Sequence, residues 1–331
     1  MRIPGLQWSV VRRLSSTAPP QDPSTYCREL VRRQAHEHYL ASLLLPHSSR
    51  SVAFALRALS CEVAAIRDSV SDRRLGQVRA QWWKDVVGKA GEEGSVNHPV
   101  ARELQALLTN HPDLNKGLLQ SLASSRDHFL SDSPFDTLEQ VEQYGMDAFS
   151  GIYLLLLEAM GNTNGHAKHA VTQLGKCEGL VTLLRGTPHN SSKRRVYLPS
   201  SLLAEMGASQ EGVLRRGPLE EGLRDVVEVV ASRAQQHLEA ARMRSKFLEK
   251  EHKLLLLPCL ACDHYLEALS KVDCNLWDKS LHTRSPTSAT LALHLTNIPL
   301  IILLVLFLLT ATPRNSQLPL SLAWHKFRAT Y

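Results

Sequence analysis

Apolar residues recur every three or four positions along most of the chain, a spacing that places them on one face of an α-helix. One such run follows Asp136, and a longer one spans residues 223–248. The first run contains Leu138, Val141, Tyr144, Ala148, Ile152 and Leu155. The sequence has no alternating runs rich in Val, Ile and Thr, which would predict strands. The pattern therefore predicts an all-α fold, with about eight to ten helices in one domain and a helix break at residues 186–195.

Composition narrows the class of protein. Of the 331 residues, 44% are hydrophobic and 21% are charged, which excludes a mostly disordered chain. The net charge of +6 is small and its basic residues are scattered, so we expect no nucleic-acid partner. The 6 cysteines are too few and too widely spaced for a disulfide scaffold, which indicates reduced thiols in an intracellular compartment. Structural zinc needs four ligands, so we interpret the single pair Cys259 and Cys262 as core residues near a helix start.

The first 23 residues have the composition of a mitochondrial transit peptide. Arg2, Arg12 and Arg13 are basic, Ser and Thr are interspersed, and no acidic residue occurs before Asp22. Their apolar residues could share a helical face, and no continuous apolar stretch is long enough for a secretory signal. We therefore expect residues 1–23 to be a transit peptide. The alternative is a frayed basic tail without a targeting role.

Residues 285–315 differ from the rest of the chain, because no Lys, Arg, Asp or Glu occurs between Arg284 and Arg314. Residues 290–311 are long enough to cross a bilayer, for which about 20 apolar residues suffice. The strictly apolar centre at residues 298–309 is shorter and also fits an interfacial or buried helix. This segment is a candidate membrane anchor, and a C-terminal tail follows it at residues 316–331.

Several motifs occur in the order typical of one enzyme family. They include Gln81-Trp-Trp-Lys-Asp85 and, as the most specific string, Arg195-Val-Tyr-Leu-Pro199. Together with residues 57–68, they resemble the squalene/phytoene synthase family, which condenses prenyl diphosphates. The resemblance implies an isoprenoid-synthase-like single helical domain with a central cavity, which we place at residues 24–284.

The same resemblance locates a metal site whose ligands are largely replaced. Family enzymes hold Mg²⁺ between two Asp-x-x-x-Asp motifs, and the metal binds the substrate diphosphate. The corresponding positions here are Ala64, Ala65, Asp68, Gly186, His189 and Asn190. Only Asp68 retains a carboxylate, since alanine and glycine supply no oxygen and neutral Asn or His is a poor ligand for a hard cation. We therefore expect a vestigial site with no catalytic residue, no metal and no cofactor.

Basic residues flank this vestigial site and could hold an anionic group. The candidates for anion or ligand binding are Arg50, Arg185, Arg195 and Tyr197. The alternative is a solvated basic loop, with Tyr197 serving as a core aromatic residue.

Within the family, the chain resembles most the mitochondrial branch that lacks the acidic motifs. That resemblance implies a non-catalytic role early in assembly of the membrane arm of respiratory complex I (NADH dehydrogenase). It also implies a location on the matrix side of the inner membrane, with complex I subunits or other assembly factors as partners. Relative to the family, residues 285–315 look inserted, either as a species-specific anchor or as an atypical splice product.

Two other functions stay open at this point. One is a Mg²⁺-dependent prenyl diphosphate transferase that uses Asp68, Asp72 and Glu62 as rearranged metal ligands. The other is a protein that binds an isoprenoid or another lipid in the old cavity.

Overall fold

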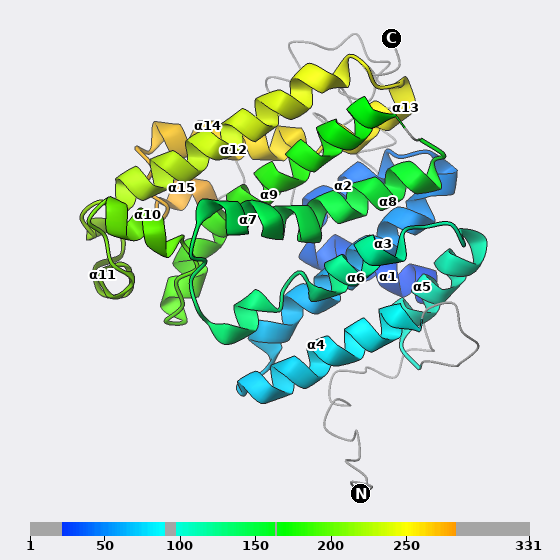
Figure 1. The fold of residues 1–331 in the computed structure, drawn as a ribbon, viewed down its shortest axis with the longest axis horizontal. Helices are drawn as coiled ribbons and strands as arrows, with labels where there is room; N and C mark the ends of the chain where they lie inside the picture. The colour runs from blue at the N-terminus through cyan, green and yellow to red at the C-terminus, as the bar shows by residue number, and fades with distance from the viewer. Residues whose placement is uncertain (1–21, 90–96, 163, 283–331) are drawn as a thin grey trace, which may run out of the picture.

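The computed structural model describes residues 22–89, 97–162 and 164–282. These residues form helices and no strand, which confirms the all-α prediction (Figure 1). The predicted apolar segment at 285–315 and the tail at 316–331 lie outside the described residues, as does the predicted transit peptide except for Asp22 and Pro23. Among the helices that are described, none is both long enough and apolar enough to cross a membrane.

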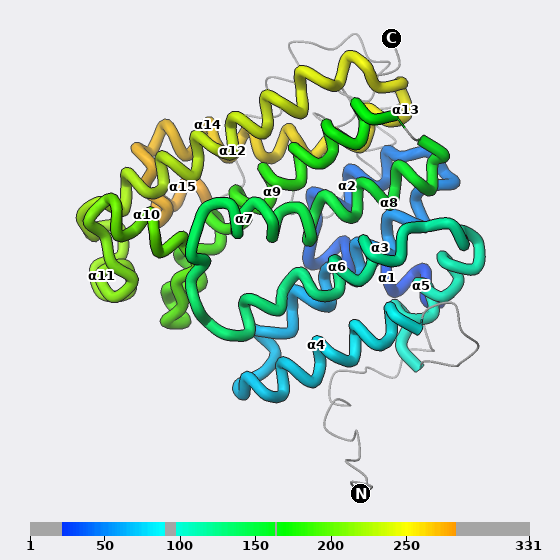
Figure 2. Tube along the Cα trace, in the orientation of Figure 1, coloured from blue at the N-terminus to red at the C-terminus, as the bar shows by residue number. Residues whose placement is uncertain are grey.

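The first half of the domain holds six helices. In order they are α1 (Pro23–Gln34), α2 (His36–Leu43), α3 (His47–Ser69), α4 (Arg73–Gly88), α5 (Pro99–Asn110) and α6 (Lys116–Ser124). A short 3₁₀ turn at His128–Ser131 follows α6. In the view of Figure 2, α4, α5 and α6 lie in the lower part of the molecule, with α4 along its edge, whereas α2 lies higher, level with α8.

The second half is built around one long helix. Its elements are α7 (Leu138–Gly145), α8 (Gly151–Ala159), α9 (Gly165–Ser192), α10 (Ser200–Glu205), α11 (Gln210–Arg216), α12 (Leu223–Ser245), α13 (Lys250–Lys253), α14 (Cys259–Lys271) and α15 (Lys279–His282). Helix α9 packs against α12, which runs antiparallel beside it, and also against α7, α8 and α14 (Figure 1). The described helices outnumber the eight to ten expected, because several are single turns that apolar spacing cannot resolve.

Close backbone contact fixes the position of α9 against α7. A Cβ atom on Gly179 would lie 2.5 Å from the Cα atom of Gly145, and one on Gly175 would lie 2.1 Å from Ser150 Oγ. Side chains at these positions would push the helices apart. The glycines therefore hold α9 at the depth that brings its C-terminal end to the site described below.

Two local predictions need correction. The run after Asp136 is not one regular helix, since a π-helical segment at Met146–Ser150 separates α7 from α8, where Ser150 Oγ donates to the Thr172 carbonyl of α9. The break expected from Gly186 is also wrong at its start, because α9 continues through Pro188 to Ser192. Proline removes only one backbone hydrogen bond there, and buried neighbours such as Leu184 and Thr187 keep the last turns packed.

Candidate functional site

A cavity of about 210 Å³ lies between α3, α4, α6, α7 and α9. It is lined by five of the residues expected at the vestigial metal site: Ala64, Asp68, Gly186, His189 and Asn190. Arg195 and Tyr197 line it as well, whereas Ala65, on the same helix as Ala64, does not. The fold thus brings together α3 and the end of α9, which are more than 100 residues apart along the chain.

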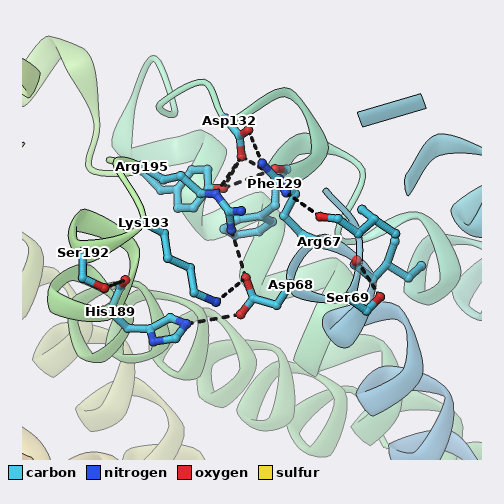
Figure 3. Close-up of polar contacts among 12 residues, drawn as sticks. Arg67, Asp68, Ser69, Phe129, Asp132, His189, Ser192, Lys193 and Arg195 are labelled. Atoms are coloured by element: carbon cyan, nitrogen blue, oxygen red, sulfur yellow. Dashed lines mark hydrogen bonds and ion pairs between the residues drawn. The ribbon is translucent and has the colours of Figure 1, made fainter. Parts of the chain in front are cut away.

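Asp68, in the last turn of α3, is surrounded by positively charged or protonatable groups (Figure 3). The Nζ atom of Lys193 and the Nη1 atom of Arg195 each lie 2.9 Å from its Oδ1 atom, and His189 Nε2 lies 3.2 Å from its Oδ2 atom. Partial burial alone would raise the pKa of Asp68, but hydrogen bonds from Lys193, His189 and Arg195 outweigh it and lower the pKa to about 2. The carboxylate is therefore ionised and held by cations from the loop after α9.

A second carboxylate extends this network. Arg195 Nε lies 3.2 Å from Asp132 Oδ1, and Arg67 Nε donates to the same oxygen at 2.7 Å (Figure 3). The hydroxyl of Tyr197 also donates to Asp132, at 3.1 Å. Asp132 has a positive φ of 55°, which turns the chain back after the 3₁₀ segment and presents its carboxylate to Arg195. Arg195 therefore links Asp68 on α3 to Asp132 through one mostly buried guanidinium.

This donor set does not fit Mg²⁺, the metal that the family resemblance implies. Magnesium requires several hard oxygen ligands in near-octahedral geometry. Of the six expected positions only Asp68 offers a carboxylate, and three neighbouring side chains already occupy it. Asp72, a ligand in the transferase alternative, instead caps the N-terminus of α4 by accepting from Arg74 N at 2.8 Å. Within the described part of the chain, no group of three or more His, Cys, Asp or Glu side chains could hold a metal ion.

Two of the candidate anion-binding residues lie elsewhere. Arg185 precedes Gly186 by one residue and therefore points to a different side of α9. Its guanidinium pairs with Glu37 at 3.3 Å and lies 5.5 Å from the ring centroid of Tyr265. Arg50 donates through Nε to the Leu45 carbonyl at 2.8 Å. Neither lines the cavity.

Sequence reasoning missed Arg126, which lines the cavity just after α6. Its guanidinium carbon lies 4.8 Å from the ring centroid of Tyr144, and at 5.5 and 5.9 Å from those of Phe129 and Phe149. A single arginine after a helix end carries no recognisable sequence signal. Only the packed structure reveals the three rings around it.

A buried polar cluster in the core was missed as well. The Tyr153 hydroxyl lies 2.9 and 3.0 Å from the two carboxyl oxygens of Glu178, and Arg57 stacks 5.4 Å from the Tyr153 ring centroid. Burial raises the pKa of Glu178 to about 7, although the positive charge of Arg57 opposes this shift. The signal in the sequence was an acidic residue on an otherwise apolar stretch of α9, between Cys177 and Gly179.

The sequence profile named squalene/phytoene synthase matches residues 31–290, which is most of the chain. The chain belongs to the squalene/phytoene synthase family. The resemblance of its motifs to that family is thereby confirmed.

Two curated relatives are identical to this chain at more than a third of the aligned residues. The protein named NADH dehydrogenase (ubiquinone) complex I, assembly factor 6 from Bos taurus is 38% identical over 270 residues, covering 82% of this chain and 80% of the relative. The protein of the same name from Homo sapiens is 35% identical over 286 residues, covering 86% of this chain and 85% of the relative. The similarity therefore extends over nearly the whole helical domain.

Solved structures share the fold at lower identity. A squalene synthase from Alicyclobacillus acidocaldarius superposes with a TM-score of 0.66 at 18% identity, covering 76% of this chain and 95% of that one. A dehydrosqualene synthase in complex with ligand gives a TM-score of 0.64 at 18% identity, covering 77% and 89%. These likenesses establish the isoprenoid-synthase-like fold of the helical domain.

Proposed function

We propose that the protein is a non-catalytic assembly factor for mitochondrial respiratory complex I, acting early on the membrane arm. The curated relatives from Bos taurus and Homo sapiens are named as a complex I assembly factor, and they match this chain over more than four fifths of its length. Its partners would then be complex I subunits or other assembly factors.

The observation that carries the non-catalytic part of the proposal is the state of Asp68. Prenyl condensation in a dry cavity needs metal to compensate the charge of the departing diphosphate. Here the one retained carboxylate is neutralised by Lys193 and Arg195, and Ala64 and Gly186 supply no ligand atom. The site therefore serves to hold α3 against the loop after α9.

The proposal includes a location on the matrix side of the mitochondrial inner membrane. The basic, acid-free start of the chain supports import into mitochondria, and the apolar segment at 285–315 supports attachment to the inner membrane from the matrix side. Fusing residues 1–25 to a fluorescent reporter tests import. A reporter that stays in the cytosol would contradict it. Carbonate extraction of mitochondria that contain the full chain, compared with a variant lacking residues 285–315, tests attachment.

Genetic rescue tests the assembly role. Human cells that lack the 35% identical relative should regain complex I on blue-native gels, and NADH:ubiquinone oxidoreductase activity, when they express this chain. The Asp68→Ala variant should rescue equally well if it accumulates to the same level, because the carboxylate performs no chemistry. Absence of rescue by a chain that is imported and abundant would contradict the proposal.

A direct assay separates this function from that of a prenyl transferase. Purified protein incubated with farnesyl diphosphate and Mg²⁺ should release no diphosphate, even at high protein concentration. Release that requires Asp68 would favour the enzyme instead.

A further inference from the structure

One of the positive charges that line the cavity, that of Arg126, is not paired with a carboxylate of the described residues. Three arginines line it, and two of them, Arg67 and Arg195, contact the carboxylates of Asp132 and Asp68. Arg126 makes no ion pair with any carboxylate in the described residues. The carboxylate next to it in sequence, Asp127, is instead paired with Lys84, at 2.8 Å.

Unsatisfied polar atoms mark the same place. Among the described residues, the buried Nε atom of Arg126 has no hydrogen-bond partner, and neither does the hydroxyl oxygen of Tyr144. Tyr144 is only 5% exposed and lines the cavity beside Arg126. A buried donor without a partner destabilises the folded state, and aromatic faces compensate a cation only in part. A ligand that accepted from both groups would remove this cost.

The other residues that line the cavity indicate the chemistry of the rest of the ligand. They are largely apolar, with Val63 and Ile66 from α3, Ala123 from α6, Leu130, and Leu183 from α9. The volume of about 210 Å³ is below the range of about 300–1,000 Å³ typical of pockets for drug-sized molecules. The cavity therefore suits one short apolar chain.

We propose that this cavity binds, without metal, a single-chain amphiphile with one carboxylate, such as a medium-chain fatty acid. The carboxylate would accept from Arg126 and Tyr144, and the chain would lie along the apolar wall. One uncompensated positive charge matches one negative charge. A diphosphate carries more, and its excess would need a metal that the donor set here does not hold. This inference goes beyond the assembly role and does not depend on it.

Binding can be measured on the purified full-length chain with decanoate as the probe. Decanoate below its micelle concentration should raise the melting temperature saturably and bind with a stoichiometry of one by calorimetry. Decanol, which has the same chain without the charge, should bind at least about tenfold more weakly, because it cannot form a charged hydrogen bond with Arg126. Farnesyl diphosphate with Mg²⁺ should produce no larger shift than without Mg²⁺.

Decanoate binding by substituted proteins tests whether Arg126 holds the carboxylate. Arg126→Met should weaken decanoate binding at least about tenfold, whereas Arg74→Met, at an exposed position on α4, should leave it unchanged. Arg126→Lys, which keeps the charge, should give intermediate affinity. Tyr144→Phe should weaken binding severalfold, and it keeps the test valid if Arg126→Met does not fold. Equal binding by wild type, Arg126→Met and Tyr144→Phe, tighter binding of decanol, or no binding of decanoate would each overturn the proposal.

Discussion

Replacing Asp68 by Asn removes one negative charge from the centre of the ion-pair network while preserving the size of the side chain. Lys193 and Arg195 would then face a neutral amide at the distance of 2.9 Å that now separates them from a carboxylate. We expect the variant to fold and to be less stable at neutral pH. The loss should be modest, since Arg195 keeps its contact with Asp132.

The magnitude follows from the pKa of Asp68. A fall in its pKa from 3.8 to about 2 corresponds to roughly 2 kcal/mol of unfolding free energy. The side chain is 45% exposed, so solvent screening reduces the expected loss to about 1 kcal/mol. Because the pKa is lower in the folded state, this stability is present above about pH 4 and is lost as the pH falls through about 2.

Urea unfolding of wild type and Asp68→Asn, followed by circular dichroism at pH 7 and pH 3, measures this difference. About half of it should remain at pH 3, and 1 M NaCl should reduce it at pH 7. Asp72→Asn is the matched control, because asparagine caps a helix as well as aspartate does, and it should change stability by less than about 0.5 kcal/mol. A loss above about 3 kcal/mol, or one independent of pH and salt, would refute the reasoning.

Three further predictions concern the metal, the helix contact and the buried acid. Millimolar Mg²⁺ should leave the melting temperature unchanged, and a rise of several degrees would show that the cavity does hold the ion. Gly179→Ala should destabilise the protein by about 3 kcal/mol or prevent folding, because its Cβ atom would lie 2.5 Å from Gly145 Cα. The control is Gly88→Ala, whose Cβ atom would have nothing within 4 Å, and it should leave the melting temperature unchanged. Burial raises the pKa of Glu178 to about 7, so its contribution to stability is full below about pH 4.5 and is lost as the pH rises through 7. The unfolding free energy of wild type relative to Glu178→Gln should therefore fall by about 2 kcal/mol from pH 5 to pH 8.

Much of the candidate site was predictable because it depends on residue identity at aligned positions. The motif Arg195-Val-Tyr-Leu-Pro199 located the end of α9 relative to α3, and five of the six expected positions do line the cavity. The ion pairs of Asp68 were not predictable from the sequence. Its three partners lie more than 120 residues away, and their distances depend on how deeply α9 packs against α7.

Arg185 and Arg126 show the limit of sequence reasoning most clearly. Both are single arginines near the expected site, yet Arg185 turns away to pair with Glu37, whereas Arg126 enters the cavity between three aromatic rings. Helical periodicity fixes the direction of a side chain relative to its own helix axis. It does not fix the rotation of that helix against its neighbours, and this rotation decides which charges meet.

By itself, the sequence determined that the chain folds into helices, which helix faces are apolar, and which of the positions expected at the family's metal site carry no carboxylate. Those properties are local, since each depends on residue type and spacing along the chain. The tertiary structure alone decided that Lys193 and Arg195 hold the Asp68 carboxylate, and that Glu178 is buried beside Tyr153. It also decided that Arg126 pairs with no carboxylate of the described helices and loops. The physical reason is that electrostatic and hydrogen-bond energies depend on distances between distant segments and on the water excluded between them, and both arise only when the helices pack.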